Sequence, residues 1–237
     1  ITLPESFTFV EDSSLVKEFT QYIDDIDDDE LMLTVSGNEN ITVSIDSFEV
    51  TFSSALNWNG IETLTFTVND NQGRDIASDE VNVIVTPVND VPEIVDIDPK
   101  ETNEDVSLTI TLSAIDPDEG DEVSFSAVSD SVDVEVSVVG DQLTMTPALN
   151  FNGIVTITVT ATDNGNLSSE TSFLLTVLPV NDSPTINLPA SFTFVEDDSL
   201  IIDFTQYVND VDENELILTV SGNENITVSI DSFEVTF

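Results

Sequence analysis

Cysteine and histidine are both absent from the 237 residues of this chain, and lysine and arginine together number only three. Without cysteine there is no disulfide to support the fold and no thiolate chemistry. Without cysteine or histidine, the chain also lacks the ligand sets that zinc and copper prefer and the usual nucleophile–base triads. The composition therefore argues against redox enzymes, zinc enzymes and triad hydrolases.

The three basic residues stand against 48 aspartates and glutamates, which gives a formal net charge of −45. Such a surface repels nucleic acid phosphates and anionic lipids, so we expect no nucleic acid partner. No stretch approaches the roughly 20 apolar residues of a membrane span, so we expect no membrane insertion. Because 40% of the residues are hydrophobic, the chain is predicted to fold, with its self-repulsion offset by bound cations or by high salt as in halophiles.

Motifs recur along the chain at a spacing of about 92 residues, so the chain is a tandem repeat. The Asn-Trp-Asn-Gly segment at 57–60 returns as Asn-Phe-Asn-Gly at 150–153, and Pro-Val-Asn-Asp occurs at both 87–90 and 179–182. Residues 1–52 match residues 186–237 at about 40 of 52 positions. We expect one repeat over 1–90, a second over 91–183 and the N-terminal half of a third over 184–237, as a window of a longer array.

Within each repeat, apolar and polar residues alternate with a period of two, as in Glu80–Val85 and Ile154–Thr160. Turn residues separate these runs every 8–12 residues or so, and about seven short strands in 90–100 residues are typical of an immunoglobulin-like sandwich. We therefore expect an all-β chain of tandem immunoglobulin-like or cadherin-like Greek-key β-sandwiches in a linear array. Prolines 87 and 92 enclose a first joint, and prolines 179 and 184 enclose a second, and both joints are predicted to be short and stiff.

Acidic residues recur at equivalent positions: Glu-Asp near the start of each repeat, Asp-x-Asp after its second strand, Asp in a Gly turn, and Asn-Asp in the joint. Calcium takes six to eight oxygen ligands from such groups. An isolated Asp-x-Asp is by default a solvated loop, but recurrence of the whole set favours Ca²⁺. The candidate ligands are Glu11, Asp25, Asp27, Asp70, Asn89, Asp90, Glu104, Asp116, Asp118, Asp163, Asn181, Asp182, Asp210 and Asp212.

Three segments follow the order of the cadherin calcium motifs: Ala114–Asp121, Ala161–Gly165 and Val180–Pro184. With the Asn-[Trp/Phe]-Asn-Gly and Pro-Val-Asn-Asp signatures, the chain resembles the bacterial cadherin-like tandem repeats of large extracellular surface adhesins. The resemblance covers the whole chain and implies calcium at each joint, held by both flanking repeats.

The resemblance also assigns ligands to each joint. For the first joint it implies Glu11, the loop Asn57–Asn59, Asn89, Asp90, Asp116, Asp118 and Asp163; for the second it implies Glu104, Asn150, Asn152, Asn181, Asp182, Asp210 and Asp212. Asp25, Asp27 and Asp70 then face an upstream repeat. Typical cadherins have Asp-Arg-Glu where residues 57–59 stand here, so two carboxylates become amides. We therefore expect one or two ions per joint, with dissociation constants on the order of 10⁻⁴–10⁻³ M.

These features predict a calcium-stiffened structural spacer of a large extracellular adhesin or surface fibre, not an enzyme, because every carboxylate pair recurs with the repeat. Two alternatives remain open. One is a calcium-dependent recognition module for a glycan or a protein. The other is a self-assembling filament or surface-layer subunit whose partners are neighbouring copies of the chain.

Overall fold

The computed structural model describes residues 1–26, 30–70 and 76–237, so Asp27 and the predicted turn at 71–73 lie outside the described residues. The chain divides into two compact units. The first holds residues 1–96, 112–126 and 159–171, and the second holds residues 97–111, 127–158 and 172–237. The candidate ligands of the first joint therefore all belong to the first unit, and those of the second joint all belong to the second unit.

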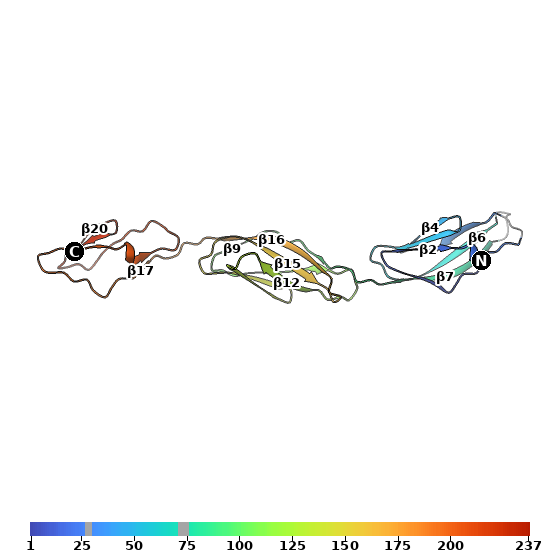
Figure 1. Ribbon diagram of the computed structural model, residues 1–237, viewed down its shortest axis with the longest axis horizontal. Coiled ribbons are helices and arrows are strands. Elements are labelled where there is room, and N and C mark those ends of the chain that lie inside the picture. The colour runs from blue at the N-terminus through green and yellow to red at the C-terminus, as the bar shows by residue number, and fades with distance from the viewer. Residues whose placement is uncertain (27–29, 71–75) are drawn as a thin grey trace. The chain divides into compact units, whose positions relative to one another are not determined.

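The first 86 residues fold into two facing sheets. Their elements are β1 (Ser6–Val10), β2 (Ser14–Glu18), the 3₁₀ turn η1 (Thr20–Tyr22), β3 (Met32–Ser36), β4 (Ile41–Asp46), β5 (Glu49–Ser54), β6 (Gly60–Asn69) and β7 (Ile76–Thr86). One sheet has the order β1-β7-β6-β3 and the other β2-β5-β4, and Figure 1 labels β2, β4, β6 and β7 in this part of the chain. β1 runs parallel to β7, which brings the residue after Val10 beside the end of β7.

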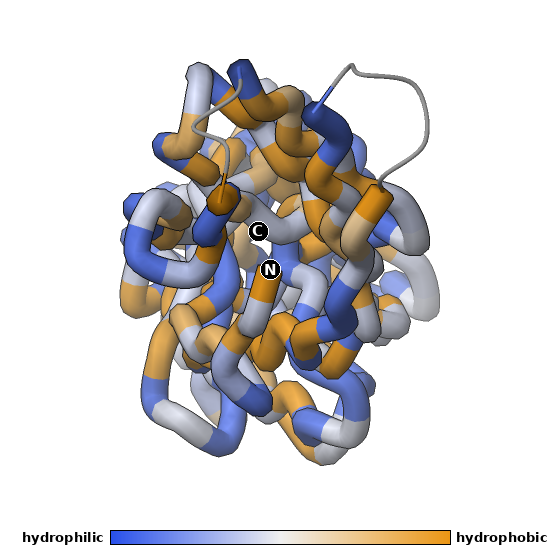
Figure 2. The backbone as a smooth tube through the Cα atoms, turned by 90° about the vertical axis from the view of Figure 1, so that its right-hand side faces the viewer, coloured by the Kyte–Doolittle hydropathy of each residue, from blue (hydrophilic) through white to orange (hydrophobic). Residues whose placement is uncertain are grey.

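Alternation along the strands decides which side chains form the core between these sheets. Every second residue of β6 from Leu64 onward is buried, as a period-two strand with one buried face requires. Phe19, Phe52 and Phe66 are fully buried, and the ring centroids of Phe19 and Phe66 lie 4.8 Å apart. Each such ring contributes roughly 1.5–3 kcal/mol by leaving water. Figure 2 shows hydrophobic and hydrophilic residues alternating along the backbone.

The same strand orders recur in the rest of the chain. The sheet β12-β15-β16-β9 repeats the order β3-β6-β7-β1, and both β10-β14-β13 and β18-β21-β20 repeat β2-β5-β4. Two short antiparallel pairs, β8 with β11 and β17 with β19, lie next to the joints in sequence. The elements are β8 (Glu93–Ile94), β9 (Lys100–Asn103), β10 (Leu108–Thr111), β11 (Ala114–Ile115), β12 (Ser124–Ser129), β13 (Val134–Val139), β14 (Gln142–Pro147), β15 (Gly153–Thr162), β16 (Ser168–Leu178), β17 (Thr185–Ile186), β18 (Ile201–Asp203), η2 (Thr205–Tyr207), β19 (Val208–Asn209), β20 (Ser229–Asp231) and β21 (Glu234–Thr236).

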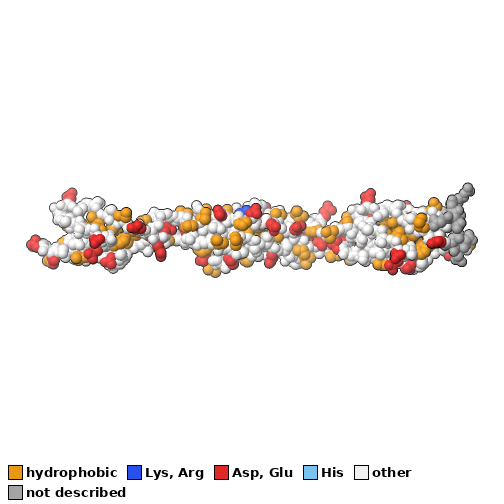
Figure 3. Space-filling model, turned by 90° about the horizontal axis from the view of Figure 1, so that it is seen from above, with side chains coloured by type: hydrophobic (Ala, Val, Ile, Leu, Met, Phe, Trp, Pro, Cys, Tyr) orange, Lys and Arg blue, Asp and Glu red, His pale blue; other side chains and the backbone are white. Residues whose placement is uncertain are grey.

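The predicted fold class is confirmed: the chain is all-β, with repeated sandwich sheets. Within the described residues, no helix has the length and apolar character needed to cross a membrane. The repeat boundaries after residues 90 and 183 stay predictions. Acidic side chains are visible along the face of the molecule in Figure 3, with very little basic surface among them.

Candidate metal centre

Glu11 is the first residue after β1 and is only 3% exposed. Its backbone N–H donates to the Thr86 carbonyl over 3.0 Å, which continues the pairing of β1 with β7 for one more residue. One oxygen of its carboxylate accepts the Val88 N–H, and the other accepts the Asn59 Nδ2 over 3.4 Å. Glu11 therefore links the end of β1 to the first joint and to the loop before β6.

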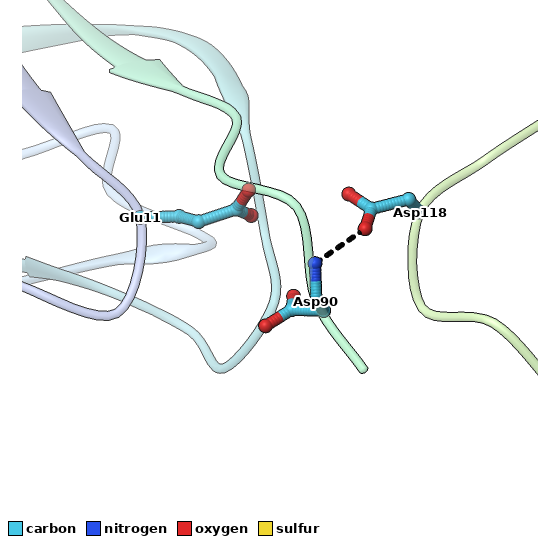
Figure 4. A group of neighbouring side chains, drawn as sticks. All are labelled: Glu11, Asp90 and Asp118. Carbon is cyan, nitrogen blue, oxygen red and sulfur yellow. Dashed lines mark hydrogen bonds between the residues drawn. The ribbon is translucent and has the colours of Figure 1, made fainter. Parts of the chain in front are cut away.

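Two further carboxylates converge on Glu11 from distant parts of the chain. Asp90 lies in the joint, and its backbone N–H donates to Asp118 Oδ2 over 2.7 Å. Figure 4 shows the Glu11 and Asp118 carboxylates pointing toward each other on either side of Asp90. One carboxylate oxygen from each of the three residues lies within 4.8 Å of the other two. This group is called the Glu11 group below.

A second group shares Asp118. One oxygen each of Asp116, Asp118 and Asp121 also lie within 4.8 Å of one another. The Asp118 N–H donates to Asp116 Oδ1 over 2.9 Å, and the Asp121 N–H donates to the Asp118 carbonyl over 3.2 Å, so a tight turn gathers the three carboxylates. Asp121 was missing from the predicted ligands. It is the last acid of the Ala114–Asp121 motif, and that position was the available signal.

Asp163 lies beside these groups but outside both of them. It is 5% exposed, and its two oxygens accept the Asn89 Nδ2 over 2.8 Å and the Leu167 N–H over 2.9 Å. Asn89 Nδ2 also donates to the Asp90 carbonyl. Asp163 thus contacts the first joint through its hydrogen bond from Asn89, and its role as a metal ligand stays a prediction.

The second joint repeats the Glu11 group with the same chemistry. Glu104, Asp182 and Asp212 place one carboxylate oxygen each within 4.8 Å of one another, and this set is called the Glu104 group. Glu104 is 4% exposed and accepts the Val180 N–H, and the Asp182 N–H donates to Asp212 Oδ2 over 2.6 Å. The Asp212 N–H in turn donates to Asp210 Oδ1 over 2.9 Å.

The predicted amides lie at the edges of these groups. Asn181 donates to the Asp182 carbonyl over 2.8 Å and accepts the Asn214 Nδ2 over 2.8 Å. The Asn57 N–H donates to Asp12 Oδ1 over 3.0 Å, and the Asn150 N–H donates to Asp105 Oδ1 over 2.9 Å. Asp12 and Asp105, the second acids of the Glu-Asp pairs, therefore hold the loops that carry the amides, a role that the sequence did not suggest.

The upstream set of predicted ligands is less well defined. Asp25 and Asp70 are both half-buried, and neither belongs to an acidic group of three among the described residues. Asp27 is not described. A calcium position built from these three residues stays a prediction.

The clustered charges alter the acidity of the carboxyls at both joints. Burial, followed by the charges of Asp12 and Asp118, raises the pKa of Asp90 above its ordinary value. Burial, followed by the charges of Asp212 and Asp105, raises the pKa of Asp182 in the same way. Burial and then the charge of Asp116 raise the pKa of Asp121. Each of these three carboxyls lies where burial and neighbouring negative charges disfavour its ionised form.

Buried carboxylate oxygens without hydrogen-bond partners bear on the kind of ion that these groups suit. Among the described residues, Asp90 Oδ2, Asp116 Oδ2 and Asp182 Oδ2 are buried and have no hydrogen-bond partner. A buried acceptor without a partner costs free energy, and a bound cation removes that cost. Because every ligand atom is a carboxylate oxygen, the donor set suits a hard divalent cation such as Ca²⁺ and not zinc or copper.

The solved structures that are similar to this chain include cadherin repeats. Domains EC21–23 of human CDH23 match with a TM-score of 0.51 at 16% identity, over 87% of this chain and 78% of that chain. Human protocadherin-24 EC1–2 matches with a TM-score of 0.45 at 19% identity, over 67% of this chain and 85% of that one. Drosophila N-cadherin EC1–4 matches with a TM-score of 0.45 at 19% identity, over 75% of this chain and 48% of that one.

No curated protein matches the chain. The family model described as "Bacterial Ig domain" matches it twice, over residues 1–86 and 89–176. Together with the cadherin-like fold, these two copies confirm the predicted resemblance to bacterial cadherin-like tandem repeats. The chain belongs to the bacterial Ig domain family.

Proposed function

We propose that this chain is a structural segment of an extracellular surface adhesin, in which calcium ions bound at the joints stiffen a series of β-sandwich repeats. The observation that carries the proposal is the Glu11 group, which draws carboxylates from three distant segments to within 4.8 Å and leaves one Asp90 oxygen buried without a partner among the described residues. The Glu104 group supports it independently, because the same arrangement is built a second time.

The physical effect follows from where the three carboxylates are attached. Glu11 follows β1, Asp90 lies in the first joint, and Asp118 follows β11. Without a cation their like charges repel, which weakens the attachment of these segments to one another. A cation bound to all three residues fixes the segments to one another, and it stabilises the ordered form by about 1.4 kcal/mol for each tenfold excess of free ion over its dissociation constant.

The number of ions is expected to differ along the chain. The first joint offers two groups that share Asp118, which is enough for two ions, and the second joint offers the Glu104 group among its described residues. Three carboxylates supply only part of a shell of six to eight oxygens, so carbonyls, amides and water complete it. Such sites bind calcium with dissociation constants on the order of 10⁻⁴–10⁻³ M, which suits an extracellular module.

Terbium luminescence tests the proposal directly, because Trp58 is the only tryptophan in the chain and lines the same cavity as Asp118 and Asp121. Terbium in place of calcium should be excited through Trp58, and calcium should displace it. Asp118→Asn should weaken binding by about tenfold or more, since it removes a carboxylate from both groups. The matched control, Glu135→Gln at an exposed position of β13, should bind like the parent chain. If Asp118→Asn binds terbium and calcium as well as the control does, the joint is not the binding site.

A further inference from the structure

A cavity of about 710 Å³ opens beside the two acidic groups of the first unit. Its wall includes Trp58, Asn59, Asp118, Glu119 and Asp121, with Pro87 and Pro117 as rigid apolar sides. Asp118 and Asp121 belong to the candidate metal centre, whereas Glu119 belongs to neither acidic group. Glu119 and Trp58 are therefore lining residues that the candidate metal centre does not use.

The polar atoms of this wall are mainly hydrogen-bond acceptors. Asp118, Glu119 and Asp121 contribute three carboxylates. The Asn59 Nδ2 donates to Glu11 over 3.4 Å, and the carbonyl oxygen of the same side chain can only accept hydrogen bonds. A wall of acceptors in a negative field favours a ligand that donates several hydrogen bonds and carries positive charge.

Trp58 adds an aromatic surface to the same cavity. It is half-buried, packs against the core of the first sandwich and lies over Gly60, so its ring has a fixed position. A cation near a tryptophan ring is attracted by the ring quadrupole, and guanidinium groups use this interaction more often than ammonium groups do. Arginine also donates up to five hydrogen bonds from a planar group, which matches several carboxylates better than the compact ammonium of lysine.

We propose that this cavity binds an arginine side chain of a basic partner protein, stacked on Trp58 and hydrogen-bonded to Glu119 and Asp121. Charge complementarity points to a partner other than a second copy, because this chain has three basic residues against 48 acidic ones. Asp118 and Asp121 serve both the cavity and the second acidic group, so calcium and the arginine compete. The partner is therefore bound when calcium is scarce and released when calcium is abundant.

The test uses Trp58 fluorescence and a short blocked peptide, acetyl-Gly-Arg-Gly-amide, with the citrulline peptide as its neutral counterpart of the same shape. In chelator, the arginine peptide should produce a saturable change that the citrulline peptide does not. Millimolar calcium should weaken the arginine signal. Glu135→Gln, far from the cavity in sequence and exposed, should bind the peptide like the parent chain.

Glu119→Gln separates this proposal from the calcium proposal. It should weaken the arginine peptide by about tenfold while calcium binding, followed by calorimetry, stays unchanged, because Glu119 lies outside both acidic groups. Asp121→Asn should weaken both ligands. An equal response to citrulline, or an unchanged arginine affinity in Glu119→Gln with the parent melting curve, overturns the proposal. A response to a neutral methyl glycoside in calcium, without one to arginine, also overturns it and identifies a sugar site.

Discussion

The environment of a single glutamate shows how the same motif acquires different properties in this chain. Glu11 and Glu104 are 3% and 4% exposed, whereas Glu196, which opens the third Glu-Asp pair, is exposed. The two buried carboxylates accept the N–H groups of Val88 and Val180, which follow β7 and β16. A buried carboxylate needs such hydrogen-bond donors. The joint that follows the last strand supplies one to Glu11 and one to Glu104.

Glu62 shows a second use of a carboxylate, in this case purely structural. It lies on β6 and accepts the N–H groups of Glu39, Asn40 and Ile41 as well as the Asn40 Nδ2, so it holds the turn before β4. Burial opposes ionisation of Glu62, but the hydrogen bonds from Asn40 and its neighbours outweigh burial and lower its pKa.

Glu62→Gln should lower the free energy of unfolding of the first sandwich by about 1 kcal/mol at pH 7, a value reduced for partial solvent exposure. A carboxyl whose folded-state pKa lies below its unfolded value, here 4.5, stabilises the fold fully above that value. The stabilisation is lost as the pH falls through the lowered pKa. Denaturant titrations across a series of pH values should therefore show a difference between variant and parent that is largest at pH 7 and shrinks as the pH falls below 4.5. A difference that does not change with pH means that the amide disrupts packing.

At the scale of an element, the loop before β6 explains the repeated Asn-[Trp/Phe]-Asn-Gly motif. Asn57 and Asn150 have φ angles of 53° and 57°, and Gly60 and Gly153 both have φ of 151°. These values lie in regions that asparagine and glycine tolerate better than other residues do. The aromatic ring between them lies against the glycine, so a Cβ at Gly60 would be 2.9 Å from Trp58, and one at Gly153 would be 3.4 Å from Phe151.

Gly60→Ala should destabilise the first sandwich by about 1–3 kcal/mol, because it combines backbone strain with a clash against the ring. Gly153→Ala shares the backbone strain but has the smaller clash, so its loss should be smaller. Thermal unfolding of both variants measures the difference. Adding Trp58→Phe to Gly60→Ala should bring its loss close to that of Gly153→Ala, and failure to do so would show that the ring is not the cause.

The sheet β2-β5-β4 contains a row of like charges. Glu49 on β5 is opposite Glu18 on β2 and Asp46 on β4, and the equivalent row in the third such sheet has Glu234 between Asp203 and Asp231. In β10-β14-β13 the central position is Gln142, between Thr111 and Val139. Like charges directly opposite one another in a sheet are destabilising.

Glu49→Gln should raise the free energy of unfolding of the first sandwich by about 0.5–1 kcal/mol at low ionic strength. The gain should shrink as salt is added, because screening weakens the repulsion that the substitution removes. Glu135→Gln is the matched control, since Glu135 is opposite Thr146. Chemical denaturation at low and at molar salt measures both variants. A gain that does not depend on salt would point to hydrogen bonding instead of charge.

For the whole molecule, the net charge of −45 makes any response to cations ambiguous until specific binding is separated from screening. Under the proposed function calcium acts through the Glu11 and Glu104 groups, whereas a halophile surface responds to ionic strength in general. The two explanations differ in the concentration and the type of ion that they need.

Small-angle scattering in fixed high monovalent salt should show a maximum dimension that grows with millimolar calcium and falls again in chelator. Asp118→Asn together with Asp212→Asn should abolish much of the change. Asp118 belongs to both acidic groups of the first joint, and Asp212 belongs to the Glu104 group of the second. Magnesium at the same concentration is the control for divalent screening. Equal responses to magnesium and calcium, or none to either, would favour solvated acidic loops.

Much of this architecture could be predicted because strand alternation is a local property. The alternating runs Glu80–Val85 and Ile154–Thr160 that the sequence predicted as strands lie within β7 and β15. The parallel pairing of β1 with β7 is not visible in the sequence, since it depends on how distant segments meet. That pairing nevertheless decides the site, because it carries Glu11 to the joint.

The sequence by itself determined that the chain repeats, that its repeats are β-sandwiches and that acids recur at equivalent positions, because period, propensity and charge are properties of neighbouring residues. Only the tertiary structure decided which acids meet. Asp121 joined Asp116 and Asp118 through a turn, while Asp163 paired with Asn89 and a backbone N–H. Convergence within a few ångströms depends on strand register and turn geometry, which are fixed only when the sheets pack and distant segments share one core.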